Sequence, residues 1–270
     1  MLLLLALVAT AIAGAIAFVN AEGTIRNGSV SRTECFESNG QVACRTISPA
    51  AAPDEFALTD LWPDDTEDGP LLAVPIVFLA IGGLLAGASM VGAEWRAGTV
   101  ATLLTWEPRR VRVAVAKLLA AGALAFVISV ALLVVFSLAM VPAGLRGSTE
   151  GTDGEWLVRL VGGMLRGGLL VSLAATFGAA VAMVGRNTAA ALGVAYAYLI
   201  IGENIVRAWK PHLSRWLLGE NAATFLLGSA PDEAPFRRGA GVAVLTLLWY
   251  VALASLAAVA TLRARDVAST

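Results

Sequence analysis

Residues 71–91 have the sequence LLAVPIVFLAIGGLLAGASMV, with no charged side chain. A helix of about 20 mostly apolar residues is long enough to cross a bilayer core of roughly 30 Å. The run is continuously apolar, whereas the strands of a membrane β-barrel alternate in polarity over about ten residues. This stretch therefore predicts a membrane-spanning helix.

Five further runs of the chain have the same character. Of its 270 residues, 58% are hydrophobic and 14% are charged, whereas about a quarter of a soluble protein is charged. The sequence predicts an all-α polytopic membrane protein, with one membrane domain over residues 1–270. Its six predicted spans are 1–19, 71–91, 118–141, 167–184, 189–202 (extending toward Val206) and 239–262.

The distribution of charge predicts a protein of the cell membrane whose N-terminus lies on the cytoplasmic side. The segments that would then face the cytoplasm, chiefly the loop 92–117 and the tail from Arg263, are short and dense in Arg and Lys, as such segments usually are. The acidic loop 21–70 and the segment 206–238 would lie outside. Segment 206–238 alternates apolar and polar patches, which predicts short helices at the outer interface. Cleavage of the first run after Ala21 is the alternative to a retained span.

The two cysteines, Cys35 and Cys44, both lie in the predicted outer loop. Such a pair in an oxidising compartment forms a disulfide, and that is our prediction; two free thiols are the alternative. No further Cys or His nearby completes a metal site.

Residues 155–166 are amphipathic and precede the fourth run. If the span begins near Leu157, Arg166 lies deep in the bilayer, where an Arg marks a substrate path. If it begins near Gly167, the segment is an interfacial helix and Arg166 extends to the membrane surface. We favour the second arrangement, because 167–184 is already long enough to cross. Small residues within the runs, such as Gly82, Gly83 and Gly87, predict close helix packing.

Several kinds of chemistry are missing from the sequence. With one His it has neither a zinc-protease motif nor a Ser-His-Asp triad, and it contains no GxxxxGK[ST] phosphate loop. A formal net charge of −1 without a basic face argues against nucleic acid as a partner. Ionisable groups are almost absent from the runs, which argues against self-powered transport. We predict neither an enzyme nor a bound cofactor.

The most informative stretch is GAEWRAGTVATLLTWEPRRVRVAVAKLLA, residues 92–120. Its first part has the periodicity of a helix, which Pro108 would end because proline lacks a backbone donor and clashes with the preceding turn. Basic residues follow directly. A short helix on the cytoplasmic surface is suited to docking a partner; the alternative is an interfacial loop that only sets topology.

The spacing Glu94-x3-Gly98-Thr99-x3-Leu103-Leu104-x3-Pro108-Arg109-Arg110, followed by Ala116-Lys117-Leu118, resembles the cytoplasmic loop of type-2 ABC (ATP-binding cassette) transporter permeases. Two weaker similarities are the turn 185–189 and the basic end 263–266. The loop motif covers about a tenth of the chain, and a six-span topology extends the resemblance over most of the rest.

The resemblance implies an export permease in which two six-span halves pair, as copies or homologues, in contact with membrane lipid. Each half docks a separate cytoplasmic ATPase subunit, which binds the ATP, through a coupling helix in the loop 92–117. The residues expected to take part in coupling are Glu94, Arg96, Gly98, Thr99, Arg109 and Arg110. Glu94 is expected to pair with a basic residue of the partner and Gly98 to allow close approach, and lipid headgroups are the other expected contact of Arg109 and Arg110.

Two rival functions are open on sequence grounds. A membrane-embedded binding or regulatory protein that transports nothing would need no ATPase partner. A membrane enzyme acting on lipid would need clustered acids, His or a nucleophile, for which Glu203, Asn204 and His212 are poor candidates.

Overall fold

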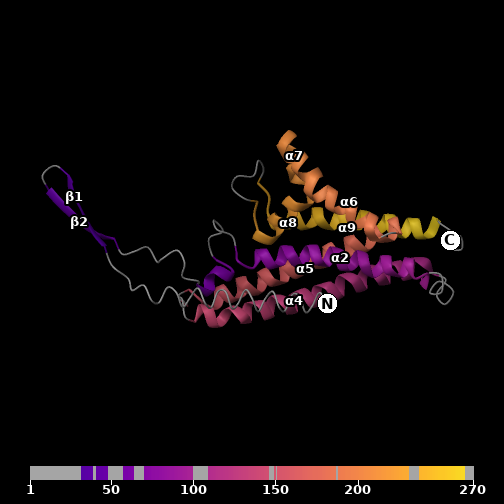
Figure 1. The fold of residues 1–270 in the computed structure, drawn as a ribbon, viewed down its shortest axis with the longest axis horizontal. Coiled ribbons are helices and arrows are strands. Elements are labelled where there is room, and N and C mark those ends of the chain that lie inside the picture. Colours follow the sequence, from indigo (N-terminus) through magenta and orange to yellow (C-terminus); the bar gives the residue numbers. More distant parts are fainter. Residues whose placement is uncertain are drawn as a thin grey trace. The chain divides into compact units, whose positions relative to one another are not determined.

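A computed structural model describes residues 32–38, 41–47, 57–63, 70–99, 109–145, 149, 151–186, 188–230 and 237–264. Within these ranges the chain is helical apart from one hairpin (Figure 1). The long helices are α2 (Ala73–Arg96), α4 (Arg110–Gly144), α5 (Gly154–Gly185) and α9 (Ala240–Ala264). The shorter elements are η1 (Leu58–Leu61), α6 (Thr188–Ala197), η2 (Tyr198–Gly202), α7 (Glu203–Trp209), η3 (Pro211–Trp216) and α8 (Leu218–Leu227).

Four of these helices are long and apolar enough to cross a membrane: Ala73–Arg96, Arg110–Gly144, Gly154–Gly185 and Ala240–Arg263. They contain the second, third, fourth and sixth predicted runs, so a polytopic helical membrane protein is the fold. The first predicted run, 1–19, lies outside the described residues. The fifth run is divided among α6, η2 and α7.

A β-hairpin lies within the predicted outer loop, where no strands were predicted. Strand β1 (Arg32–Ser38) pairs antiparallel with β2 (Gln41–Ile47), and the register sets Cys35 opposite Cys44. Cα atoms of directly opposed residues in antiparallel strands are about 4.5 or 5.5 Å apart. Both separations lie within the roughly 4.4–6.8 Å that a disulfide spans. The backbone register therefore agrees with the predicted disulfide, which stays a prediction.

The chain divides into two compact units, and the division crosses α4 and α5. Unit 1 is Met1–Asp65 with Leu132–Leu160, and unit 2 is Thr66–Ala131 with Val161–Thr270. In unit 1 the side chain of Leu58, on η1, fills the space beside Gly144, and Leu61 and Trp62 are buried. Part of the outer loop thus belongs to a packed core, although its composition predicts a poor core former.

Helix α5 shows no break at the boundary expected between an interfacial helix and the fourth span. Its 32 residues correspond to a length of about 48 Å at 1.5 Å per residue, well beyond a bilayer core of roughly 30 Å. Arg166 is exposed on this helix, and its guanidinium lies near Gly228, the left-handed residue that ends α8. The expected separate helix over 155–166 is therefore the first part of α5.

Glycines bring the helices of unit 2 together. A Cβ on Gly83 would come within 3.0 Å of the Val171 carbonyl oxygen, and one on Gly87 would overlap the backbone of Ala175. These contacts advance together along α2 and α5, so the two helices run parallel and touch through their backbones. This confirms the close packing predicted from the small residues.

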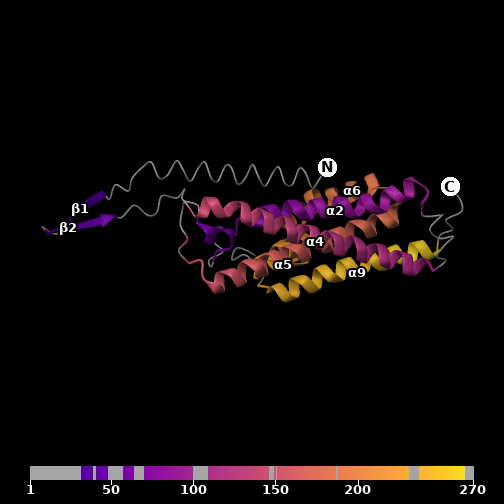
Figure 2. The same ribbon diagram turned by 90° about the horizontal axis from the view of Figure 1, so that it is seen from below.

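Helix α4 runs antiparallel to α5. Gly122 on α4 lies against Ser172 and Thr176, whereas Gly168 on α5 lies against Phe126 and Val130, so the contacts advance in opposite directions. The axes of α2, α4, α5 and α9 within unit 2 are roughly aligned, and α4 runs along this axis in the opposite sense to α2 and α5 (Figures 1 and 2). Such alternation is what successive membrane crossings require.

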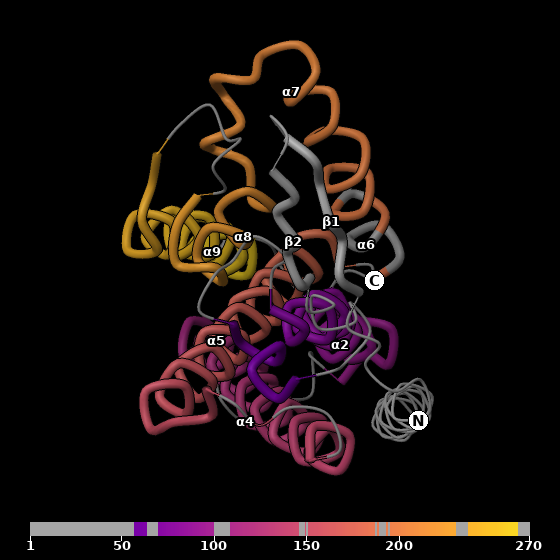
Figure 3. The backbone as a smooth tube through the Cα atoms, turned by 90° about the vertical axis from the view of Figure 1, so that its left-hand side faces the viewer, coloured from indigo at the N-terminus to yellow at the C-terminus, as the bar shows by residue number. Residues whose placement is uncertain are grey.

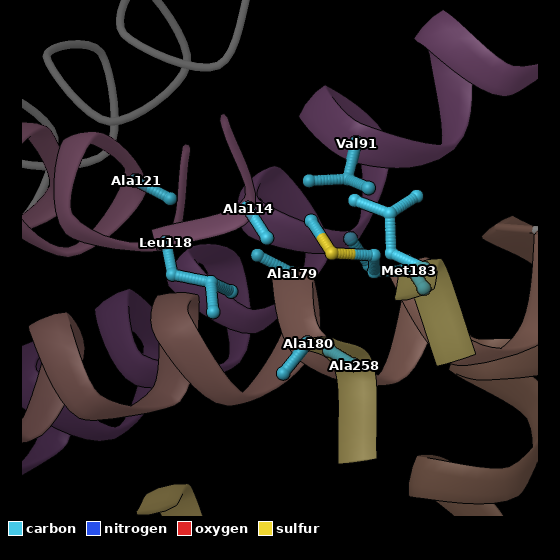
Figure 4. Packing of buried hydrophobic residues seen from close by; sticks show 11 residues of the cluster. Val91, Ala114, Leu118, Ala121, Ala179, Ala180, Met183 and Ala258 are labelled. Atoms are coloured by element: carbon cyan, nitrogen blue, oxygen red, sulfur yellow. The ribbon is translucent and has the colours of Figure 1, made fainter. Parts of the chain in front are cut away.

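An alanine-rich core joins these four helices near the C-terminal ends of α2, α5 and α9 (Figure 4). Its fully buried side chains are mostly methyl groups, with Val91, Leu118, Met183 and Leu262 filling the wider gaps. The complete cluster is Ala88, Val91, Ala114, Leu118, Ala121, Ala179, Ala180, Ala182, Met183, Ala258 and Leu262. This core fixes the end of the bundle that carries the predicted coupling residues.

The segment from α6 to α7 is one continuous helical stretch that contains a π-helical turn, η2. It is tilted against the other helices, and the view along the bundle shows α6 and α9 apart, connected through α7 and α8 (Figures 1 and 3). Its apolar side chains are largely exposed, among them Tyr196, Ile201, Ile205 and Trp209. Segment 206–238 contains η3 and α8, as the alternation of apolar and polar patches predicts.

Candidate functional site at the Glu94 end of the bundle

The candidate site begins where α2 ends. Glu94 and Arg96 lie in the last turn of α2, and Ala97 follows as its C-cap. Gly98 has a φ of 69°, a left-handed conformation that stops a helix and that glycine adopts most readily. A Cβ on Gly98 would have no described atom of its own chain within 4 Å, so the backbone conformation favours a glycine here, and close approach of a partner at Gly98 stays a prediction.

Thr99 closes the turn that Gly98 opens. The Thr99 hydroxyl donates a hydrogen bond to the Glu94 carbonyl oxygen at 3.2 Å, and the Gly98 N–H donates to the Trp95 carbonyl oxygen at 3.3 Å. These bonds satisfy carbonyls that the helix end leaves without partners. The predicted coupling helix is thus continuous with α2 as far as Arg96, and residues 100–108 lie outside the described ranges.

Glu94 forms an ion pair with Lys117 of α4. Lys117 shares a helix face with the buried residues Ala114, Leu118 and Ala121, and this face directs its long side chain toward α2. The Lys117 side chain is 16% exposed and that of Glu94 33%. Sequence reasoning expected a partner for Glu94 on another protein, whereas the structure supplies one within the chain.

Trp95 contacts a second neighbour, the turn between α5 and α6. The Arg186 guanidinium lies 4.6 Å from the centre of the Trp95 ring, a cation–π geometry. Arg186 has a φ of 52°, which an L-residue other than Gly seldom adopts. Beside this stack α2 meets the start of α6 so closely that a Cβ on Gly92 would overlap Thr188. Sequence reasoning noted this turn only as a weak similarity.

The first residues of α4 complete the site. The Arg109 carbonyl oxygen accepts from the backbone N–H groups of Arg112 and Val113, which starts the helix. Arg110 Nη1 donates to the Leu262 carbonyl oxygen at 3.3 Å, near the C-terminus of α9, where a cation is favoured by the helix dipole. Arg110 thus has a structural contact with α9, and the side chains of Arg96 and Arg109 are exposed.

A small cavity of about 10 Å³ lies within this junction, lined in part by Glu94, Trp95, Lys117 and Leu262. That volume holds at most one water molecule. This cavity is therefore too small for a substrate or cofactor. The site is a junction of charged side chains where the ends of α2, α4 and α9 meet the turn between α5 and α6. The parts of the chain that the structure describes contain no cluster of His, Cys, Asp and Glu able to hold a metal.

A second polar cluster surrounds Glu203, which sequence reasoning named only as a poor candidate for the site of a membrane enzyme. Its side chain is 3% exposed; one carboxylate oxygen accepts from the Gly219 N–H at 2.9 Å and the other from Arg207 Nη2 at 3.3 Å. Arg207 Nε also donates to Glu220 at 2.7 Å. The cluster is satisfied internally and connects α7 to α8, so its role is structural.

The polar network continues to the start of α9. Asn221 Nδ2 donates to the carbonyl oxygens of Arg215 and Leu217, and Arg238 Nη1 donates to the Arg215 carbonyl oxygen at 2.8 Å. Tyr250 on α9 donates to the Trp216 carbonyl oxygen at 2.9 Å. Segment α7–η3–α8 is thereby fixed to α9.

No protein-family model, curated protein or solved structure matches this chain.

Proposed function

We propose that the chain is the membrane-spanning permease subunit of an ATP-driven ABC exporter. A separate cytoplasmic ATPase would bind and hydrolyse ATP, and the chain would couple that cycle to export across the cell membrane. The observation that carries the proposal is the Glu94 end of the bundle. There α2 stops at a left-handed glycine, directly before the loop whose residues resemble the coupling loop of type-2 ABC permeases.

The geometry of the helices supports six spans. From Thr188 to Trp209 the helical stretch is about 33 Å long at 1.5 Å per residue, enough to cross a bilayer core. It starts next to Gly92, and α9 returns to the same end, where Leu262 meets α4. With the first run as a further span, both the coupling loop and the C-terminus would face the cytoplasm.

The surface of the spans supports the expected lipid contact and the pairing of two permeases. Large apolar side chains on α2 and α9 are exposed, for example Phe78 at 70% and Leu256 at 65%. In water such a surface would aggregate, whereas in a bilayer it is covered by acyl chains or by a second copy.

The test is purification of the tagged protein from its host membrane in mild detergent, with mass spectrometry of what accompanies it. We expect a stoichiometric ATPase subunit containing a phosphate loop. A variant with Arg96→Ala and Thr99→Ala should retain less of it, whereas Lys210→Ala, exposed at the end of α7, should retain the wild-type amount. An intact bundle that repeatedly retains no ATPase would favour a non-transporting membrane protein.

A further inference from the structure

Two neighbouring residues at the end of α2 reach two different parts of the bundle. Successive side chains of a helix are separated by about 100° of rotation, so Glu94 and Trp95 point in different directions from α2. Glu94 pairs with Lys117 on α4, and Trp95 stacks with Arg186 in the turn after α5. Together these contacts hold the last turn of α2 from two directions.

The Arg186 conformation is informative because it costs free energy. The left-handed region is unfavourable for residues other than Gly, and the position after a helix is usually glycine for this reason. At this turn the chain has Arg, directly after Gly185, with its guanidinium over the Trp95 ring. The stack with Trp95 offsets the strain, which is a reason to look for a role of the contact.

The Glu94–Lys117 pair is also more than a surface ion pair. Lys117 is largely buried beside the alanine-rich core, so a Lys without a partner would leave a poorly solvated charge inside the bundle. Thr99 hydrogen-bonds to the backbone of Glu94, so a shift of Glu94 would also move the start of the loop. Contact with Lys117 therefore bears on the direction in which the loop leaves α2.

We propose that Glu94, Lys117, Trp95 and Arg186 form an internal clamp that positions the coupling loop, and that Glu94 acts within its own chain and not as a contact for the ATPase. We call these four residues the Glu94 clamp. The inference rests on the proposed function and assigns the clamp residues as positioning residues. Docking to the ATPase then falls to the exposed residues beyond the clamp, among them Arg96 and Thr99.

A charge-swap cycle separates positioning from docking. Glu94→Lys and Lys117→Glu each place two like charges in contact, whereas the double variant restores opposite charges in the same place. If Glu94 acts within the chain, the double variant recovers what each single variant loses. If Glu94 meets a basic residue of the ATPase, Lys at position 94 repels that residue whatever stands at position 117.

Two readouts are measured for the wild type, both single variants, the double variant and the control Lys210→Glu, which makes the same reversal at an exposed position. The first is thermal unfolding of the purified protein in detergent, which does not depend on function. The second is stimulation of the co-purified ATPase. We expect each single variant to unfold at lower temperature and to lose roughly fivefold or more of the stimulation, a usual size for coupling between sites. The double variant should recover both, and the control should match the wild type.

A second cycle covers the case in which a reversed charge prevents folding. Lys117→Met leaves Glu94 without its cation, and Glu94→Gln in the same protein removes the uncompensated charge. The double variant should therefore unfold closer to the wild-type temperature than Lys117→Met does, and it should regain stimulation.

The outcomes are distinct. Recovery of both readouts supports the clamp. Recovery of thermal stability without ATPase stimulation overturns it and makes Glu94 a docking residue, and additive losses in both cycles overturn it as well. A folded wild type that retains no ATPase overturns the proposed function, and the coupling role of the clamp with it.

Discussion

The contact between α2 and α5 makes a quantitative prediction at two glycines of one helix. At Gly87 an added Cβ would overlap the carbonyl group of Ala175, which is part of a helix backbone and cannot rotate away. Adding a methyl group to a fully packed position costs about 1–3 kcal/mol. At Gly82 an added Cβ would have nothing within 4 Å, so Gly82→Ala gains only helix propensity, up to about 1 kcal/mol.

Gly87→Ala should therefore be less stable than Gly82→Ala by about 1–3 kcal/mol, the packing cost alone, because both variants gain the same helix propensity. The assay is unfolding of the two purified variants and the wild type by SDS in mixed micelles, followed by circular dichroism. Because both changes add the same methyl group to the same helix, their difference isolates the packing. Equal stability of the two variants would refute the close approach of α2 to α5.

Three further predictions test other features. Gly98→Ala should lower the free energy of unfolding by roughly 1–2 kcal/mol, because alanine is disfavoured at the left-handed φ of this position. The main effect should be weaker retention of the ATPase. Unchanged retention would contradict a role of this turn in docking. Arg207→Met should lower the free energy of unfolding by about 1–3 kcal/mol, because it leaves the buried Glu203 carboxylate without its cation. Adding Glu203→Gln to this variant should recover part of the loss. A double variant that is no more stable than Arg207→Met would contradict the ion pair. Cys35 and Cys44 should resist thiol labelling in the denatured, unreduced protein and react after reduction, and labelling of both before reduction would show free thiols.

The sequence predicted the membrane helices well because a lipid environment imposes a simple rule. Every backbone group must be satisfied and apolar side chains must cover it, so hydropathy alone locates the spans. The third run illustrates what hydropathy does not predict. Its apolar part starts at Leu118, yet α4 starts at Arg110, because Lys117 and Arg110 find partners on α2 and α9. Those partners depend on which helices are neighbours, and hydropathy carries no such information.

At the candidate site, too, the sequence identified individual residues but not the contacts between them. The sequence singled out Glu94 and Gly98 through the spacing of a loop, and both lie at the end of the bundle where charged residues gather. It could not reveal that Lys117 pairs with Glu94 or that Arg186 stacks on Trp95, since these contacts depend on α4 and on the turn after α5. The role of Gly98 likewise follows from a backbone angle that spacing does not encode.

The alanine-rich core has a consequence for motion. A methyl group has no rotamers, so an interface built from Ala88, Ala114, Ala179, Ala180 and Ala258 has few side-chain conformations to rearrange when one helix moves past another. Interlocked leucines would have to leave one set of holes and enter the next, whereas methyl groups present a nearly smooth surface. Small sliding displacements of packed helices are one way in which proteins change state. The alanine contacts of this core would therefore resist sliding of the helices less than interlocked leucines would, and the charged contacts of the Glu94 clamp add resistance at its end.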